Sequence, residues 1–320
     1  MTQTAADGWT AQEAARFAQG IVQNIGKVLE GKLQQVELAL ATVMAGGHLL
    51  LEDVPGLGKT MLARALAVSI GLDFRRIQFT ADLMPSDIVG GPVYNPKDGS
   101  FLLRPGPAFS NVVLADEINR ANPRAQSALL ECMEEGQITL DGQTLRLPEP
   151  FLVLATQNPI DMAGTYPLPE AQLDRFLIRL SLGYPSPEVE AGLIATQQFE
   201  HPIARLTAVC GAQEFAKLVM SARSTFISPD ITDYIAAIVG ATRKHPGIRF
   251  GASPRGTLGL ARMARALSCI RGLAYVDPAI VRELAVPVLA HRIIVQTQSA
   301  QAKAPAALIQ EILATLQTPR

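Results

Sequence analysis

A glycine-rich loop at residues 49–60, LLLEDVPGLGKT, contains the residue types needed to bind the phosphates of a nucleotide. An apolar run precedes the loop and a helical pattern follows it, so backbone N–H groups can surround an anion at the positive end of a helix. Gly56 and Gly58 would permit that close approach. Lys59 would reach the β- and γ-phosphates, and the Thr60 hydroxyl would bind Mg²⁺. The loop therefore predicts a site for ATP and Mg²⁺.

One position departs from the usual G-x-x-x-x-G-K-[ST] pattern, because Asp53 stands where the first glycine belongs. Aspartate tolerates the left-handed backbone better than most residues, so we expect it to replace that glycine. The alternative is a chance glycine-rich turn before a helix, which the strand–loop–helix context disfavours. The residues expected to bind the nucleotide are Asp53, Val54, Pro55, Gly56, Leu57, Gly58, Lys59, Thr60, Met61 and Asp116.

Two acids end the apolar part of NVVLADEINR at residues 111–120. Asp116 would hold Mg²⁺ together with Thr60, and Glu117 would polarise the attacking water. Ligands of parallel α/β sheets gather at the carboxyl edge of the strands, which would bring these acids to the loop. The alternative is that both acids only start a helix as favourable N-terminal charges.

A third apolar run, FLVLATQNP at residues 151–159, contains Asn158 near its end. If its strand lies between the strands that carry the loop and the two acids, Asn158 can orient the water or contact the γ-phosphate. Taken alone, the same residues would be an ordinary Asn-Pro turn. The prediction for Asn158 therefore depends on the strand order.

Short apolar runs separated by helical patterns predict an α/β fold with a mostly parallel sheet. The runs cover residues 48–51, 74–79, 111–115, 151–156 and 176–180. Helical patterns cover residues 10–45, 60–70 and 123–133.

Beyond residue 184 the pattern changes to helices alone. Three helix starts are predicted by a capping side chain before a proline, at Ser228-Pro229, Ser253-Pro254 and Asp277-Pro278. We therefore expect an α/β nucleotide-binding domain at residues 1–184 and an all-helical domain at residues 185–320.

These blocks, in this order, resemble the MoxR family of AAA+ ATPases. The resemblance to the MoxR family rests on LLLEDVPGLGKT, QFTADLMPSDIVG (78–90), ADEINRA (115–121), ATQNP (155–159) and EAQLDRF (170–176), and the wider resemblance to AAA+ ATPases also includes GASPRGTL (251–258). It covers residues 20–318 and implies a P-loop AAA+ core, with a parallel sheet and helices on both faces, plus a smaller all-α lid domain. It also implies a hexameric ring with ATP between the subunits.

Carried onto this chain, the resemblance implies that Arg175 in LDRF is an arginine finger that enters the neighbour's site. It implies that Arg255 in SPR is the lid's sensor arginine, which reads the γ-phosphate. Both cations would stabilise the charge that hydrolysis spreads over the phosphoryl oxygens. Each could instead be a surface arginine paired with an acid, and Arg255 in a first helical turn needs an anionic partner. Arg120 could also face the interface, or have no such role.

Two segments of alternating polarity around Asp-Gly predict inserted hairpins, VYNPKDGSFLLR (93–104) and GQITLDGQTLRLP (136–148). Similar hairpins project from the ring in the helix-2-insert branch of AAA+ proteins, so the resemblance implies that they transmit the nucleotide state to a client. The alternative is two passive surface hairpins.

Composition narrows the class of protein further. The net charge of −1 gives no electrostatic reason to expect nucleic-acid binding. No apolar stretch reaches the ~20 residues of a membrane span, and the N-terminus has no secretory signal. The three cysteines have no metal-ligand spacing. We therefore expect a cytoplasmic protein without a membrane span.

The resemblance implies a chaperone-like ATPase that remodels or activates partner proteins. One example would be metal or cofactor insertion into partners with a von Willebrand factor A domain. A nucleic-acid motor and the motor subunit of a metal chelatase, both from the same AAA+ branch, are alternatives. A nucleotide-gated scaffold that barely turns over is another, and Glu117 argues against it.

Overall fold

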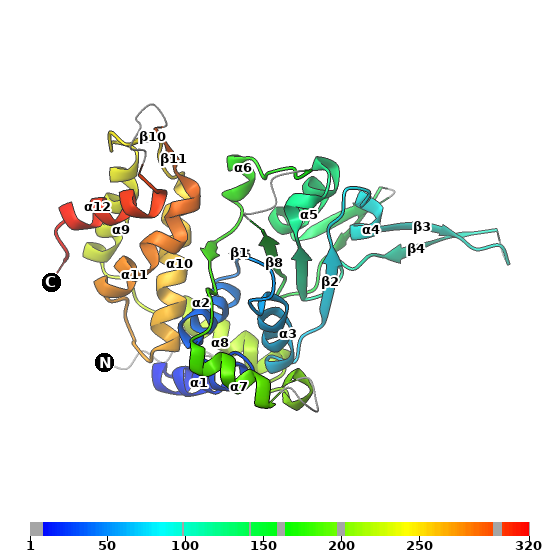
Figure 1. Ribbon diagram of the computed structural model, residues 1–320, viewed down its shortest axis with the longest axis horizontal. Helices are drawn as coiled ribbons and strands as arrows, with labels where there is room; N and C mark the ends of the chain where they lie inside the picture. The colour runs from blue at the N-terminus through cyan, green and yellow to red at the C-terminus, as the bar shows by residue number, and fades with distance from the viewer. Residues whose placement is uncertain are drawn as a thin grey trace.

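A five-stranded parallel sheet with the strand order β2-β5-β8-β1-β9 forms the centre of the computed structural model (Figure 1). The structure describes residues 9–97, 99–140, 142–158, 164–196, 202–296 and 303–319. The strands are β1 (Leu49–Glu52), β2 (Phe74–Gln78), β5 (Val112–Asp116), β8 (Leu152–Gln157) and β9 (Ile178–Leu180). All five predicted strands are confirmed. β8 lies between β1 and β5, as the prediction for Asn158 requires.

Each face of the sheet has its own apolar core, because alternate residues of a strand point to opposite sides. Leu49 and Leu51 of β1 belong to one core, and Leu50 belongs to the other. The first core includes α1 (Ala11–Gly26), α2 (Leu33–Met44) and α3 (Lys59–Ser69). The second includes α4 (Pro85–Val89) and α5 (Pro123–Glu135). Helices therefore cover both faces of the sheet, which confirms the predicted fold class.

The helical pattern predicted for residues 10–45 is two helices rather than one. α1 ends at Gly26 and α2 begins at Leu33, and Gly31 between them has a φ of 73°. Glycine adopts this left-handed conformation without strain, so the turn is encoded locally. The prediction of one continuous helix was wrong because the apolar spacing continues on both sides of the turn.

The C-terminal part consists mainly of helices, as the predicted lid requires. Its helices are α7 (Pro187–Thr196), η2 (Pro202–Arg205), α8 (Ala212–Ser224), α9 (Pro229–Thr242), α10 (Pro254–Ile270), α11 (Pro278–Leu289), η3 (Ala290–Arg292) and α12 (Pro305–Thr315). The side chains of Ser228, Ser253 and Asp277 cap α9, α10 and α11, so all three predicted helix starts are confirmed. None of the helices in the described ranges is both long enough and apolar enough to cross a membrane.

One short antiparallel pair interrupts this helical part. β10 (Ile248–Phe250) pairs with β11 (Ile294–Val295), and no strand was predicted beyond residue 184. Strands of two and three residues are too short to show an alternating pattern, so the sequence carried no signal for them.

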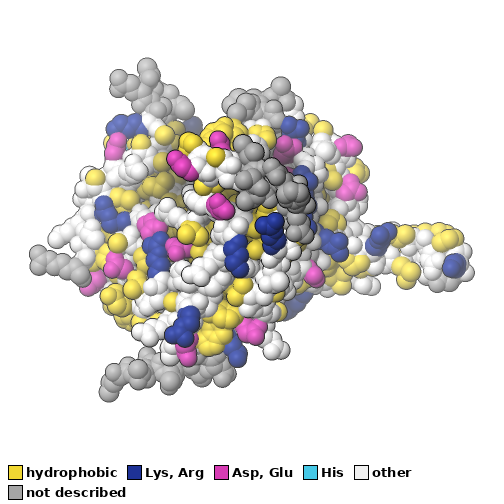
Figure 2. Space-filling view, turned by 60° about the horizontal axis from the view of Figure 1, so that its bottom comes forward, with side chains coloured by type: hydrophobic (Ala, Val, Ile, Leu, Met, Phe, Trp, Pro, Cys, Tyr) yellow, Lys and Arg dark blue, Asp and Glu magenta, His cyan; other side chains and the backbone are white. Residues whose placement is uncertain are grey.

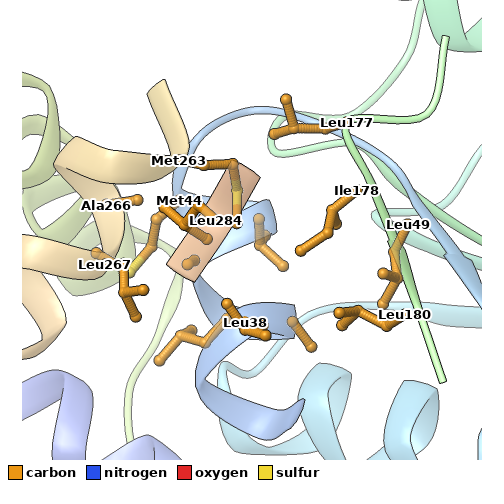
Figure 3. Packing of buried hydrophobic residues seen from close by; sticks show 14 of the residues in the cluster. Leu38, Met44, Leu49, Leu177, Ile178, Leu180, Met263, Ala266, Leu267 and Leu284 are labelled. Carbon is orange, nitrogen blue, oxygen red and sulfur yellow. The ribbon is translucent and has the colours of Figure 1, made fainter. Parts of the chain in front are cut away.

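The lid packs directly against the edge of the sheet. Figure 3 shows the apolar side chains that meet there: Leu38, Met44, Leu49, Leu177, Ile178, Leu180, Met263, Ala266, Leu267 and Leu284. They come from α2, from β1 and β9, from Leu177 just before β9, and from the lid helices α10 and α11. α1 and α2 also pack against α10, so the first helices of the chain lie on the lid side. The boundary at residue 184 therefore stays a prediction.

Both predicted hairpins are antiparallel pairs, β3 (Gly90–Tyr94) with β4 (Phe101–Pro105) and β6 (Gln137–Leu140) with β7 (Gln143–Arg146). Their predicted turn residues Asp98 and Asp141 lie outside the described residues. Figure 2 shows that the β3–β4 hairpin projects well beyond the body of the protein. It exposes large apolar side chains, which are Val93, Tyr94, Phe101 and Leu102. Such an exposed apolar patch is typical of an interaction site.

Candidate functional site

The loop between β1 and α3 has the backbone geometry that phosphate binding requires. Gly56 and Gly58 have φ values of 88° and 90°, where a side chain would be strained. α3 begins directly after Gly58, so the loop lies at the free N–H groups of a helix N-terminus. Lys59 Nζ donates to the carbonyl oxygens of Asp53 at 2.5 Å and Val54 at 3.4 Å. The lysine is thus held across the loop.

A cavity of about 450 Å³ lies over this loop. Its lining residues are Pro55, Gly56, Gly58, Lys59, Thr60, Met61, Arg64, Arg76, Gln78, Asp116, Glu117, Asn158 and Ile203. The volume is in the range of small-molecule sites, roughly 300–1,000 Å³. Asp53, Val54 and Leu57, also assigned to nucleotide binding from the sequence, belong to the loop but do not line the cavity.

Lys59 lies among acids in this cavity. Burial lowers the pKa of Lys59 from its usual value, and the carboxylates of Asp53, Asp116 and Glu117 oppose that decrease. A cation partly removed from water and close to the loop glycines suits a phosphate group better than a fully solvated one.

The two acids at the end of β5 are held by the neighbouring strand. Thr156 Oγ1 donates to Asp116 Oδ1 at 2.6 Å and accepts from the Glu117 N–H at 2.8 Å. Glu117 has a φ of 58° and is the one non-glycine residue of the described ranges with a positive φ. Holding it there costs on the order of 1–3 kcal/mol, and such strain concentrates at functional sites. Thr156 therefore stabilises the backbone that presents Glu117 to the cavity.

Two residues of β2 that the sequence analysis missed complete the acidic side of the cavity. Arg76 Nη2 donates to Asp116 Oδ2 at 2.6 Å, and Gln78 Nε2 donates to Glu117 Oε2 at 2.9 Å. Gln78 lies opposite Asp116 in the β2–β5 ladder. A signal was present, because Arg76 and Gln78 are polar residues two apart in a predicted strand and so share one face.

The oxygen donors in this cavity suit Mg²⁺. Thr60 supplies a hydroxyl and Asp116 a carboxylate, and both line the cavity. Mg²⁺ is commonly bound through one or two protein oxygens, with phosphate oxygens and water as its other ligands. The guanidinium of Arg76 already lies against Asp116, so this position accommodates a positive charge.

Asn158 and Arg120 both lie near these acids. Asn158 directly follows β8, is buried and lines the cavity, which places it between the loop on β1 and the acids on β5. Arg120 Nε lies 3.3 Å from Glu117 Oε2. Arg120 therefore has an acidic partner within its own chain.

Asp53 does not have the left-handed backbone that was predicted for it, so that explanation was wrong. Its buried carboxylate accepts from Ser181 Oγ at 2.6 Å and from the N–H groups of Leu182 at 2.6 Å and Gly183 at 3.3 Å. These partners are 128–130 residues away in the sequence, where local turn preferences carry no information. The acid ties the phosphate loop to the chain that leaves β9.

Asp53→Ala should lower the free energy of unfolding by about 2–4 kcal/mol, because buried donors lose a charged acceptor. Asp53→Gly, which restores the usual glycine of the loop pattern, should be destabilised by a similar amount. Urea denaturation of the two variants measures both effects. If Asp53→Gly were as stable as the wild type, the carboxylate would not have this structural role.

Arg175 and Arg255 lie together, at the other end of β1 from the phosphate loop. They line a second cavity of about 290 Å³ with Gly46, Gly47 and His48, which precede β1. The phosphate loop follows β1, and a strand of four residues spans roughly 13 Å. Neither arginine lines the cavity over the loop of its own chain.

Glu134 on α5 binds both of these arginines. Arg175 Nη2 lies 2.9 Å from Glu134 Oε2, and Arg255 Nη2 donates to Glu134 Oε1. Within the chain, each arginine is thus paired with an acid, as the alternative interpretation of the sequence held. Glu134 also supplies the anionic partner that Arg255 needs in the first turn of α10.

A network around Asp174 fixes the backbones of the two arginines relative to each other. Asp174 Oδ2 accepts from Ser253 Oγ at 2.9 Å, and Asp174 Oδ1 accepts from Arg292 Nε at 2.9 Å. The Arg292 side chain is only 3% exposed. Burial lowers its pKa to about 10, and Asp174 opposes the decrease. Because Asp174 precedes Arg175 and Ser253 caps the helix of Arg255, the network joins the lid to the sheet.

Two family models match separate parts of this chain. Residues 48–178 match the ATPase family associated with various cellular activities (AAA), and residues 240–312 match the AAA lid domain. The first range contains the phosphate loop and four of the five strands of the sheet, and the second contains the helices that pack on its edge. The chain is therefore an AAA+ protein of the P-loop class.

Similarity to individual known proteins assigns the chain to one family within this class. The chain is 47% identical to the uncharacterized protein YeaC of Bacillus subtilis, over 93% of both chains. It is 40% identical to the chaperone MoxR1 of Mycobacterium tuberculosis, over 92% of this chain and 81% of that one. A solved structure from Cytophaga hutchinsonii, described as a candidate ATPase, superimposes with a TM-score of 0.89 at 37% identity and covers 97% of both chains. The chain belongs to the MoxR family of AAA+ ATPases.

Proposed function

We propose that this chain hydrolyses ATP with Mg²⁺ at a site that a neighbouring subunit of a hexameric ring completes. The observation that supports it is the position of Arg175 and Arg255 at the opposite end of β1 from their own phosphate loop. Side chains so placed do not reach a phosphate bound by their own subunit. They can act on a nucleotide only if a second copy brings its loop to them.

In this proposal, the subunit that supplies the phosphate loop binds ATP and activates the attacking water. Lys59 binds the β- and γ-phosphates, and Thr60 and Asp116 hold Mg²⁺, which screens the phosphate charge when bound. Glu117 accepts a proton from the attacking water, and Asn158 orients that water.

The neighbour's side of the site supplies positive charge. Arg175 and Arg255 donate to the phosphoryl oxygens on which negative charge develops during hydrolysis. Hydrolysis therefore needs two subunits, whereas ATP binding needs only one.

Dilution tests the shared site. Phosphate release per subunit should fall steeply as the protein is diluted through the concentration at which rings dissociate, followed in parallel by analytical ultracentrifugation. ATP binding per subunit should change much less. A monomer that hydrolyses ATP at the full rate at every dilution would contradict the proposal.

Lys59→Ala should weaken ATP binding by about 100-fold or more, because a charge-assisted contact to the phosphates is lost. Titration with a fluorescent ATP analogue measures the dissociation constant. Lys217→Ala, an exposed lysine of α8 outside the cavity, is the matched control and should bind as the wild type does. Tight binding by Lys59→Ala would remove the basis for assigning this loop to the phosphates.

We also propose that the ATPase remodels or activates partner proteins in the cytoplasm. Its relative MoxR1 is named a chaperone, and the projecting β3–β4 hairpin offers exposed apolar side chains to a client. The family resemblance favours a client with a von Willebrand factor A domain, with metal or cofactor insertion as one outcome. Replacing the exposed apolar residues Val93, Tyr94, Phe101 and Leu102 together by threonine should abolish stimulation by such a client and leave basal ATP hydrolysis intact. Equal stimulation after the replacement would exclude these side chains from the client contact.

A nucleic-acid motor is the competing function. The net charge of this protein, −1, gives no general attraction to the phosphate backbone of a nucleic acid. Stimulation of phosphate release by DNA at low salt, lost at high salt, would favour the motor over the chaperone-like function.

A further inference from the structure

Glu134 lies next to both Arg175 and Arg255, and the proposed reaction gives this acid no role. It lies in the last turn of α5, and its two carboxylate oxygens are divided between Arg175 and Arg255. The first arginine precedes β9 at the edge of the sheet, and the second belongs to the lid helix α10. One carboxylate thus gathers the two guanidinium groups at one place.

The backbone positions of Arg175 and Arg255 are fixed, so only the positions of their guanidinium groups remain to be determined. The contacts of Asp174 with Ser253 and Arg292 fix where each arginine side chain begins. Arginine has a long, flexible side chain, so the place where its guanidinium group lies depends on the partner at its end. In this structure that partner is Glu134.

The charge around this second cavity supports a specific role for Glu134. Its lining includes four arginines and two acids, which are Arg175, Arg255, Arg262, Arg292, Glu134 and Asp174. Asp174 already accepts from Ser253 and from the buried Arg292. Among these lining residues, Glu134 is therefore the acid that neutralises Arg175 and Arg255.

A phosphate group can replace such a carboxylate. Arginine binds carboxylate and phosphate oxygens with the same geometry, and a terminal phosphate presents enough oxygens for two arginines. The side chains of Glu134, Arg175 and Arg255 are 37%, 28% and 51% exposed, so an anion from outside can approach them. Ion pairs at this level of exposure are weak and easily exchanged.

We propose that Glu134 is a positioning residue that occupies the place of the neighbour's terminal phosphate. It holds both guanidinium groups side by side in the separate subunit, and the arginines exchange it for the γ-phosphate when the shared site closes. This inference rests on the proposed function, because it requires that Arg175 and Arg255 act on the nucleotide of another subunit.

Mixed rings test the inference because they separate the subunit that binds ATP from the subunit that donates the arginines. Arg175→Ala subunits have an intact loop and lack the finger, whereas Lys59→Ala subunits have the arginines and a disabled loop. In a mixture of the two, the active sites combine the loop of the first with the arginines of the second. Glu134→Gln is then added either to the subunit that donates the arginines or to the subunit that binds ATP.

In the arginine-donating subunit, Glu134→Gln should lower the ATP concentration for half-maximal phosphate release by about three- to tenfold, because two partly exposed ion pairs no longer compete with the phosphate. The maximal rate should change by less than about twofold, since the arginines themselves are intact. In the ATP-binding subunit, the same substitution should change neither quantity. Glu190→Gln, an exposed acid on α7 that lines neither cavity, makes the same charge change and should have no effect in either subunit.

The outcomes separate the inference from the function on which it rests. If the mixture without any Glu134 substitution releases no phosphate, the shared site itself is wrong. If that mixture is active but Glu134→Gln in the donating subunit leaves the half-saturating ATP concentration unchanged or raises it, Glu134 does not stand in for the phosphate. A lower melting temperature with a lower maximal rate and no gain in ATP affinity would show a purely structural role and overturn the inference.

Discussion

Arg175→Ala should slow ATP hydrolysis by about 10³–10⁵-fold, the effect typical of removing an arginine finger. ATP binding by the same variant should stay close to that of the wild type, because Arg175 does not line the cavity over its own loop. Steady-state phosphate release and titration with a fluorescent ATP analogue measure the two quantities. Arg223→Ala, an exposed arginine on α8, is the control and should retain full activity.

Mixing shows whether the arginine acts on the neighbouring subunit. Neither Arg175→Ala nor Lys59→Ala should hydrolyse ATP alone, but each supplies what the other lacks. With random assembly of equal amounts, about one quarter of the interfaces would combine an intact loop with an intact arginine. Activity should therefore return to a comparable fraction of the wild-type rate. If mixing restored nothing, Arg175 would not be a finger that acts between subunits.

Glu117→Gln should bind ATP normally and lower the rate of hydrolysis by about 10²–10⁴-fold, because the amide cannot accept a proton from water. The substitution is close to isosteric, and the Glu117 N–H would still donate to Thr156. The left-handed backbone at this position should therefore be preserved.

Single-turnover measurements distinguish this defect from lost binding. ATP should remain bound and unhydrolysed on Glu117→Gln after gel filtration, and the rings should persist at lower protein concentration than those of the wild type. Glu190→Gln, an exposed acid on α7, serves as the control with the same chemical change. Near-normal turnover by Glu117→Gln would assign the activation of water to another residue.

The sheet and the phosphate cavity could be predicted because their determinants are local. The buried strands β1, β5 and β8 appear as apolar runs, and the loop glycines with Lys59 form one continuous segment. Asp116 and Asn158 come from distant segments, yet the rule that parallel strands carry ligands at their carboxyl ends brought them to the loop. The strand order then confirmed that β8 lies between β1 and β5.

The remaining contacts depend on pairings between distant segments. Asp53 was assigned a backbone role because its hydrogen-bond partners at the end of β9 cannot be inferred from the residues around it. In the same way, no local pattern links Glu134 on α5 with Arg255 on α10, since 121 residues separate them.

In the proposed ring, the hydrogen bonds of Asp174 would link the lid of one subunit to the active site of its neighbour. Asp174 directly precedes Arg175 and accepts from Ser253, which caps the helix that carries Arg255. The backbones of both arginines would therefore move as one body relative to the nucleotide of the adjacent subunit. The rate of hydrolysis at that site would then depend on the conformation of the subunit that supplies the arginines, and successive sites would not turn over independently.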